Sequence, residues 1–295
     1  MSIRESRAER AMNHAFVVIL ILLSALMLFP FINLLAKSVS GEAAVLTGSV
    51  YLLPKDFQLG TYEYVVNQPQ FFNSFWNSLF ITVVGTALAM VVNCLTAYPL
   101  SKTWIVGRKG LILFFVFTML FSGGMVPSFL LIRSLDLMNT RWSVILSCLL
   151  STYYVVLVTN FIRSLPGSLL ESARLDGASE ATILVRIVLP LSKPILATIA
   201  LFYAVDKWNE WWNSMLYINR MEMYPLQLIL QNIINTYQSA TDRNIASADA
   251  LNRLKTFSMG IKMAAIVVTM LPIMCVFPFL QRFFVKGIMI GAVKG

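Results

Sequence analysis

Residues 171–194 read ESARLDGASEATILVRIVLPLSKP, and this polar stretch separates two long apolar segments of the chain. The flanking segments, near residues 143–162 and 195–218, each offer the ~20 apolar residues that a helix needs to cross a membrane. The first ten positions of the stretch hold four charged residues, namely Glu171, Arg174, Asp176 and Glu180. Charged side chains stay in water unless they are paired, so the stretch is predicted to be an aqueous loop between two membrane spans.

Helix-capping signals predict the local structure of this loop. Ser168 and Glu171 have the spacing of a capping box, which predicts that a short helix begins at Ser168. Gly177 suits the left-handed residue that follows the end of such a helix. Ser179 is a good N-cap for a second helix. Residues 164–194, which we name the knob, are therefore predicted to form two short helices joined at a glycine. The alternative is one amphipathic helix lying on the membrane surface.

The composition is that of an integral membrane protein. The chain is 58% hydrophobic and 13% charged, with a mean hydropathy of +0.73, whereas ordinary soluble domains are about 25% charged. Six apolar blocks are long enough to span a bilayer, which predicts an all-α membrane protein with six transmembrane helices. The predicted spans are residues 15–36, 76–100, 111–132, 143–162, 195–218 and 259–280.

Basic residues predict the orientation in the membrane. Arg4, Arg7 and Arg10 precede the first apolar block, but this block exceeds the 7–15 residues of a signal-peptide core, so we expect a retained anchor. With the N-terminus inside, more than half of the 23 Lys and Arg residues fall on the cytoplasmic side, as the positive-inside rule requires. We expect a multi-pass protein with both termini in the cytoplasm. The net charge of +9 then reflects topology, not nucleic-acid binding.

Several chemistries are excluded by what the chain lacks. Cys94, Cys148 and Cys275 each lie alone in an apolar block, which is typical of packing thiols and not of a disulfide framework or zinc site. His14 is the only histidine, so the chain has neither a His-based metal site nor a Ser-His-Asp triad. Nothing matches the Gly-rich phosphate loop of nucleotide hydrolases. No catalytic residue, metal or bound cofactor is predicted, and the chain is not expected to hydrolyse ATP itself.

The segments between the spans also carry signals. The third predicted span is interrupted at residues 121–127, FSGGMVP, and such a break is tolerated where a helix lines a cavity or packs closely on a neighbour. The outer segment 37–73 contains strand-like and turn-like pieces, and the loop 220–257 is expected to be partly helical. The predicted division is residues 1–72 for the first span and outer segment, 73–281 for a five-helix core, and 282–295 for a cytoplasmic tail.

The knob resembles the coupling loop of ABC importer permeases. The pattern of that family is Glu-Ala-Ala (the EAA motif), three residues, Gly, nine residues, and Ile-x-Leu-Pro. Ser172 replaces the second Ala, one small residue for another, and the residues that match are Glu171, Ala173, Gly177, Ile187, Leu189 and Pro190. Asp176-Gly177-Ala178 is the form usual in sugar importers. Residues 121–127, 263–272 (MAAIVVTMLP) and 277–295 also resemble the MalG-type, LplC-like branch of carbohydrate permeases.

This resemblance implies a complete transport system in a bacterial inner membrane. The fold would be a MetI-like permease core with a cytoplasmic coupling helix that docks into one of two ABC ATPase subunits, which use ATP and Mg. A solute-binding protein would deliver an oligosaccharide, specifically one derived from alginate, and a second permease would complete a heterodimer that works by alternating access. The C-terminal tail would reach between the ATPases. The residues implied to carry the coupling are Glu171, Ser172, Ala173, Asp176, Gly177, Ala178, Ile187 and Pro190.

The fifth predicted span carries the candidates for the cargo pathway. Charges in a span cost roughly 2.5–3.5 kcal/mol each and usually face a partner or water. Lys207 and Glu210 have the spacing of a pair on one helix face. Aromatic rings beside amides suit sugars, but the same rings fit an interfacial belt, and polar residues in other spans more often bond neighbouring helices. The candidate pathway residues are Tyr203, Trp208, Asn209, Trp212, Asn213, Asn77 and Ser122, of which Trp208-Asn209 resembles a Trp-Asn pattern of sugar permeases.

Other functions fit parts of this pattern. An importer of amino acids or peptides would share the frame, but the Asp-Gly-Ala form and the C-terminal tail disfavour it. An ion-coupled carrier would use Asp206, Lys207 and Glu210 and would work without ATP, so uptake in vesicles that lack the ATPase distinguishes it. A membrane enzyme would need clustered catalytic groups that the sequence does not offer.

Overall fold

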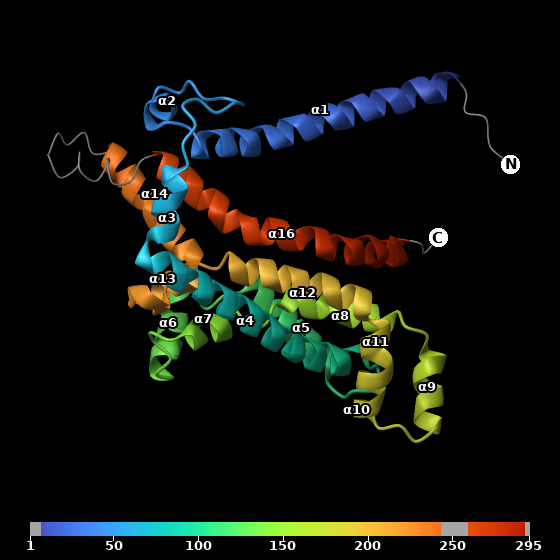
Figure 1. Cartoon of the computed structure of the whole chain (residues 1–295). Helices are drawn as coiled ribbons and strands as arrows, with labels where there is room; N and C mark the ends of the chain where they lie inside the picture. The colour runs from blue at the N-terminus through green and yellow to red at the C-terminus, as the bar shows by residue number, and fades with distance from the viewer. Residues whose placement is uncertain (1–6, 243–258, 293–295) are drawn as a thin grey trace. The chain divides into compact units, whose positions relative to one another are not determined.

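The structure is a computed structural model that describes residues 7–242 and 259–292, and each regular element in that part of the chain is a helix (Figure 1). These helices belong to two compact units. Unit 1 comprises residues 1–68 and 232–270, and unit 2 comprises residues 69–231 and 271–295. The predicted all-α class is therefore confirmed.

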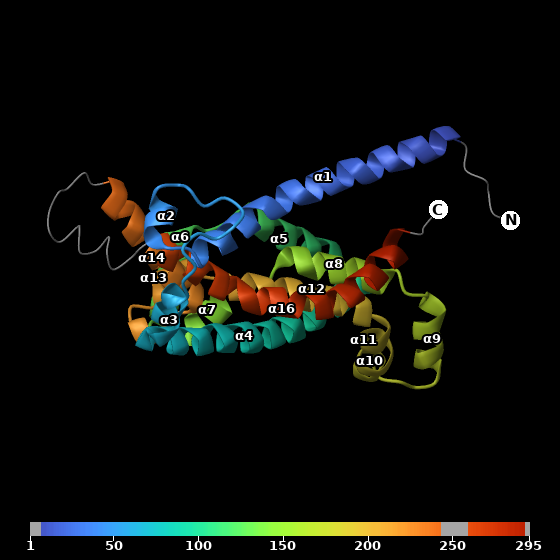
Figure 2. The ribbon, with the colours of Figure 1, turned by 45° about the horizontal axis from the view of Figure 1, so that its top comes forward.

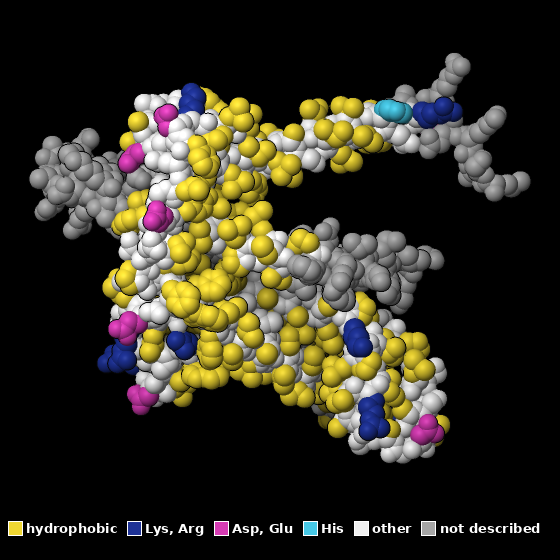
Figure 3. Space-filling view, in the orientation of Figure 1, with side chains coloured by type: hydrophobic (Ala, Val, Ile, Leu, Met, Phe, Trp, Pro, Cys, Tyr) yellow, Lys and Arg dark blue, Asp and Glu magenta, His cyan; other side chains and the backbone are white. Residues whose placement is uncertain are grey.

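Unit 1 is built on the long apolar helix α1 (Arg7–Ser38). Between its ends, the face of α1 seen in Figure 3 carries hydrophobic side chains, as expected of a helix in contact with lipid. The other complete helices of the unit are α2 (Glu42–Leu46) and α3 (Gly60–Asn67). Asn33 of α1 donates to the carbonyls of Val50 (3.2 Å) and Tyr51 (2.6 Å), which holds the segment after α2 against α1. Part of the predicted outer segment 37–73 is helical, since α2 and α3 lie within it.

Unit 2 is organised around the 33-residue helix α4, which packs against α8 and α12. Its complete helices are α4 (Pro69–Ser101), α5 (Arg108–Leu120), α6 (Met125–Ser134), α7 (Arg141–Ser147), α8 (Thr152–Arg163), α9 (Gly167–Leu175), α10 (Glu180–Ile183), α11 (Leu189–Leu191), α12 (Lys193–Trp208) and α13 (Trp212–Tyr217). Small side chains let the helices approach closely: Gly85, Ala89 and Ala97 lie on the buried face of α4. Gly85 faces the Lys207 side chain, whose Cδ would lie 3.4 Å from an added Cβ.

Three helices of the described chain are long and apolar enough to cross a membrane, over Met12–Ser38, Pro69–Ser101 and Met259–Val276. The other candidates are bent pairs, namely Arg108–Leu120 with Met125–Ser134 (110°), Arg141–Ser147 with Thr152–Arg163 (53°), and Glu180–Leu191 with Lys193–Trp208 (82°). The described residues thus hold three to six spans. The predicted interruption of the third span is confirmed, with Gly124 at φ +87° between α5 and α6.

The fourth and fifth predicted spans are wrong as continuous helices. The fourth breaks at residues 148–151, where Lys207 Nζ donates to the carbonyls of Ile145 (3.3 Å) and Cys148, and Tyr203 Oη accepts from the Ser151 N–H (3.1 Å). These contacts satisfy backbone groups that the break leaves without helical partners. The fifth ends at Trp208 instead of Ile218, because the chain turns there to start α13.

The remaining predictions concern the last quarter of the chain. The predicted partly helical loop contains α14 (Leu226–Asp242), while residues 243–258 lie outside the described part. The backbone of α16 (Met259–Ala292) is helical well beyond the predicted end of the sixth span at residue 280. Most of the predicted tail therefore continues this helix, and residues 293–295, like Arg4, lie outside the described part.

Candidate functional site

The knob forms two helical arms joined at Gly177, and Figures 1 and 2 both show α9 beside the arm made of α10 and α11. Gly177 has φ +81°. Its N–H donates to Arg174 O and the Ala178 N–H donates to Ala173 O, each at 3.0 Å. This pair of bonds is the Schellman motif, which requires a left-handed residue at this position. The predicted glycine corner is confirmed, and the alternative of one continuous amphipathic helix is not what the segment forms.

The N-termini of the two arms differ from each other. The Ser179 hydroxyl accepts from the Thr182 N–H at 3.2 Å, so the predicted cap of α10 is confirmed. The predicted capping box at Ser168 is wrong, because α9 already begins at Gly167 and has no side-chain cap. Pro166 precedes this helix with φ −57°, a value that its ring fixes and that allows the helix to start earlier.

The residues predicted to carry coupling fall into two groups. Ala173 is buried, and Ala178 and Ile187 are partly buried against the hydrophobic core around α4, so they attach the knob to unit 2. The others face away from the core and are exposed, namely Glu171, Ser172, Asp176, Gly177 and Pro190. Leu175, next to the glycine corner, is 89% exposed. Sequence reasoning missed Leu175, although an apolar residue among charged ones was a usable signal.

The second arm changes its helical form before it reaches α12. A π-helical turn, Leu184–Val188, joins α10 to α11, and the Leu189 N–H donates to the Leu184 carbonyl five residues back. Pro190 follows at once and has no N–H of its own to continue a regular ladder. The arm then meets α12 at an 82° bend. Isolated π-helical turns occur frequently at functional sites.

The Glu180 carboxylate joins both arms of the knob to the end of α4. Its Oε2 accepts from Tyr98 Oη at 2.5 Å and lies 3.8 Å from Lys102 Nζ. Its Oε1 accepts from Arg174 Nε at 2.8 Å. The Lys102 ammonium also lies 4.2 Å from the centre of the Tyr98 ring, a cation–π distance. We name these four side chains the Glu180 cluster. Sequence reasoning did not find it, because Tyr98 and Glu180 are 82 residues apart.

Two pKa shifts follow from this arrangement. Burial tends to raise the pKa of Glu180, but the hydrogen bonds from Tyr98 and Arg174 and the charges of Lys102 and Arg174 outweigh burial and lower it. Burial lowers the pKa of Lys102, helped by the Arg174 charge and opposed by Glu180. The carboxylate is thus held in its charged form within the cluster.

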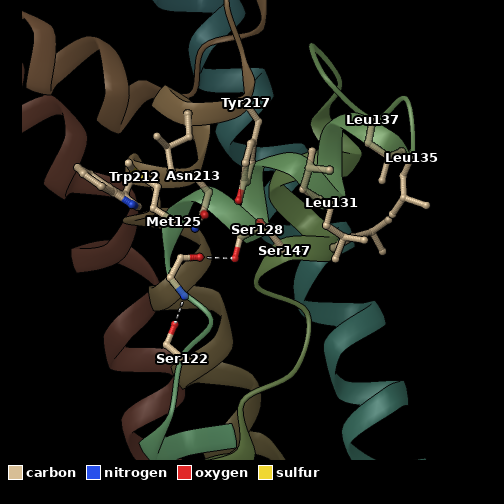
Figure 4. Close-up of a pocket in the computed structure, with 14 residues that line it drawn as sticks. Ser122, Met125, Ser128, Leu131, Leu135, Leu137, Ser147, Trp212, Asn213 and Tyr217 are labelled. Carbon is tan, nitrogen blue, oxygen red and sulfur yellow. Dashed lines mark hydrogen bonds between the residues drawn. The ribbon is translucent and has the colours of Figure 1, made fainter.

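A pocket of about 480 Å³ lies elsewhere in unit 2, among α6, α7 and α13 (Figure 4). Three of the predicted pathway residues line it, namely Ser122, Trp212 and Asn213. Ser128 donates to Gly124 O (2.9 Å), and Ser122 Oγ accepts from the Gly124 N–H (3.2 Å), so the break in the third span forms one wall. None of the 14 lining residues is charged. The pocket therefore offers hydroxyl, amide and aromatic groups but no charged side chain.

The other predicted pathway residues lie outside this pocket. Asn77 is buried, and its amide donates to the carbonyls of Glu222 (2.8 Å) and Tyr224 (3.2 Å) and accepts from Arg141 Nε (2.9 Å). Tyr203 is buried, and its hydroxyl contacts Asn93 and Ser151. Trp208 is buried and packs edge-on against Phe75. Asn209 is exposed, donates to Val205 O and accepts from Gln227.

The charged side chains of the fifth span have different hydrogen-bond partners, and Lys207 and Glu210 do not form the predicted i, i+3 salt bridge. Lys207 is 3% exposed and donates to carbonyls at the end of α7. Glu210 Oε1 accepts from the Asn213 N–H at 2.8 Å, in the first turn of α13. Asp206 accepts from Tyr154 Oη at 2.7 Å. Across residues 7–242 and 259–292, no three His, Cys, Asp or Glu side chains are grouped as a metal site would require.

Known proteins resemble this chain over nearly its whole length. Protein LplC of Bacillus subtilis (strain 168) is 40% identical over 294 residues, which cover 100% of this chain and 98% of that protein. The polygalacturonan/rhamnogalacturonan transport system permease protein YtcP of the same organism is 38% identical over 283 residues, covering 94% of this chain and 96% of that protein. No family model matches the chain.

A solved structure extends this similarity to the fold. It is the crystal structure of a bacterial ABC transporter involved in the import of the acidic polysaccharide alginate. One of its chains superposes with a TM-score of 0.82 at 32% sequence identity, and the match covers 96% of this chain and 100% of that chain.

Proposed function

Because this chain belongs to the family of sugar ABC transporter permeases, we propose that it is a membrane-spanning subunit of an ATP-driven importer of oligosaccharides. The observation that carries the proposal is the knob. Its two short arms are fixed at a left-handed glycine, tied to α4 by Glu180, and present an exposed Leu175 at the tip. A rigid projection of this kind suits the transfer of movement from a separate protein.

We propose partners for the chain as well, and its similarity to ABC transporter permeases supports them. Two cytoplasmic ABC ATPase subunits bind ATP with Mg and hold one knob each, and their movement turns the spans between inward-open and outward-open states. A second, related permease completes the membrane unit, and a solute-binding protein delivers the cargo from outside. Of the knob residues, Glu171, Asp176 and Leu175 lie on the face that is free to meet an ATPase.

The proposed orientation has the knob and both termini in the cytoplasm of a bacterium, as the distribution of Lys and Arg supports. Cysteine labelling tests it. Ser172→Cys in otherwise cysteine-free protein should react with a membrane-impermeant maleimide only after the cells are opened. Labelling in intact cells would place the knob outside and would contradict the proposal.

The proposed cargo is an oligosaccharide from an acidic polysaccharide, with alginate as the specific case, and the relatives named for alginate and polygalacturonan support it. The pocket lined by Ser122, Trp212 and Asn213 is the proposed contact of this subunit with the sugar. Pockets of this size bind ligands through apolar surface and a few placed polar groups. Since the lining residues carry no charge, they would meet ring faces and hydroxyls, while the sugar carboxylates are met by other parts of the transporter.

Reconstitution tests the proposed function. The chain, its partner permease, the ATPases and the binding protein are placed in proteoliposomes, and uptake of labelled alginate oligosaccharides is compared with uptake of neutral malto-oligosaccharides. We expect uptake that requires ATP on the ATPase side and the binding protein on the other. Uptake by this chain alone under an ion gradient would instead indicate a carrier and would overturn the proposal.

A further inference from the structure

Glu180 is the one point at which a charged hydrogen-bond network of the knob meets a membrane-spanning helix in the described part of unit 2. Arg174 belongs to the first arm, Glu180 begins the second arm, and Tyr98 lies in the last turn of α4. The two carboxylate oxygens divide these roles, since Oε1 accepts from Arg174 and Oε2 accepts from Tyr98. One side chain therefore fixes three elements relative to each other.

We propose that the Tyr98–Glu180 hydrogen bond is the joint through which movement of the knob reaches α4, so that Tyr98 and Glu180 are positioning residues for coupling. This inference rests on the proposed function of the knob as the contact with an ATPase. It assigns a role to two side chains outside the EAA pattern.

The apolar contacts between the knob and α4 cannot replace this joint. Ala173, Ile183 and Val188 belong to the same buried apolar cluster as Ala97 and Leu100. Apolar contacts are non-directional, so helices packed only through them can slide over each other. A hydrogen bond to a charged oxygen is short and directional and roughly twice as strong as a neutral one. The 2.5 Å contact between Tyr98 and Glu180 thus fixes the direction in which the knob can move relative to α4.

A displacement of α4 at Tyr98 would also move the opposite end of this helix. Asn77 and Tyr98 are 21 residues apart on one helix, which at 1.5 Å per residue is roughly 30 Å, about the thickness of the hydrocarbon core. Asn77 holds Arg141, the first residue of α7, and the carbonyl of Glu222. The end of α7 lines the pocket through Leu146 and Ser147. Helix α4 therefore connects the knob to a wall of the proposed sugar contact.

The experiment uses the complete reconstituted transporter and measures oligosaccharide delivered per ATP hydrolysed. Tyr98→Phe keeps the ring and its packing but removes the hydroxyl, and Glu180→Gln removes the charge. Each is expected to lower this ratio about tenfold, as expected for loss of one charge-assisted hydrogen bond. The double variant should be no worse than either single one, because both break the same contact. Tyr153→Phe, at an exposed tyrosine in the first turn of α8, is the matched control and should leave the ratio unchanged.

Each outcome decides the question. An unchanged ratio in Tyr98→Phe, or effects of the two substitutions that multiply in the double variant, would overturn the inference while leaving ATP-driven transport by the native protein intact. Failure of both single variants to assemble would also overturn it, because the contact would then serve folding and not coupling. If the native transporter itself shows no ATP-dependent uptake, the proposed function fails, and that result is distinct from the others.

Discussion

Replacing Gly177 by valine is expected to separate ATP hydrolysis from transport, because the corner of the knob requires a left-handed backbone. Gly177 has φ +81°. Non-glycine residues pay a steric penalty there of ~1–2 kcal/mol, and a β-branched residue is the least tolerated. A Cβ added at Gly177 would find no atom of this chain within 4 Å. The effect within this subunit must therefore come from the backbone and not from a clash.

The size of the effect can be worked from this penalty. With ~2 kcal/mol for valine, the native corner becomes roughly 30-fold less populated relative to alternatives. Alanine at ~1 kcal/mol lowers it about fivefold, and asparagine, which tolerates the left-handed region, lowers it less. When residue 177 leaves this region, the bonds from its N–H to Arg174 O and from the Ala178 N–H to Ala173 O are lost. The first arm is then held to the second only by the Arg174–Glu180 contact and by apolar packing, so its direction is less well fixed.

The assay compares binding-protein-stimulated ATP hydrolysis with uptake in proteoliposomes. We expect uptake to fall in the order Gly, Asn, Ala, Val at position 177. The matched control is Gly167→Val, because Gly167 lies in the same knob with equally open surroundings and without a left-handed φ. The reasoning would be refuted if Gly177→Val coupled normally, or if Gly167→Val were equally harmful. If the alanine variant supported more uptake than the asparagine variant, the loss would come from a steric conflict with the docked ATPase and not from backbone strain.

Three further predictions address other parts of unit 2. Lys207→Met should lower the stability of the purified protein by ~1–3 kcal/mol because buried carbonyls at the end of α7 lose their donor. Thermal unfolding measures the loss, and Lys193→Met, at an exposed lysine, is the control. Equal stability of the two variants would contradict the prediction. Trp212→Ala should lower uptake severalfold without changing basal ATP hydrolysis. The control is Trp76→Ala, at an exposed tryptophan away from the pocket, which should change neither uptake nor hydrolysis. Equal loss of uptake in both variants would contradict the proposed contact between the pocket and the sugar. The folded-state pKa of Glu180 is below its ordinary value of about 4.3. The stabilising contribution of the Glu180 carboxylate is therefore complete above that pH and is lost as the pH falls through the lowered pKa. The difference in stability between the native protein and Glu180→Gln should be constant from about pH 5 to 8 and shrink in acid, and a difference that changes near neutral pH would contradict the assignment.

Local signals in the sequence were sufficient to predict the fold class and several turns of this molecule. Hydropathy alone indicates a helical membrane protein, since burial of ~20 apolar residues in lipid needs no tertiary information. The left-handed Gly177 and the cap at Ser179 were readable because each involves residues within a few positions of the chain. The break at residues 121–124 was readable because paired glycines weaken a helix wherever it packs. The interpretation failed where two local signals competed, as at Ser168, where the preceding proline starts the helix.

Long-range contacts decided where the fourth span breaks and which polar side chains meet. The fourth span is broken because Lys207, 59 and 62 residues away, supplies donors to its free carbonyls, and no pattern within residues 143–162 could show that donor. The sequence names Asn77 and Tyr203 as pathway candidates, and only the folded chain shows their carbonyl, guanidinium and amide partners. The Glu180 cluster exists only because α4 ends beside the knob. Sequence determined which segments enter the membrane and where the chain turns, because those are local free energies. The tertiary structure decided which polar groups meet, because a hydrogen bond depends on distances of a few ångströms that only packing sets.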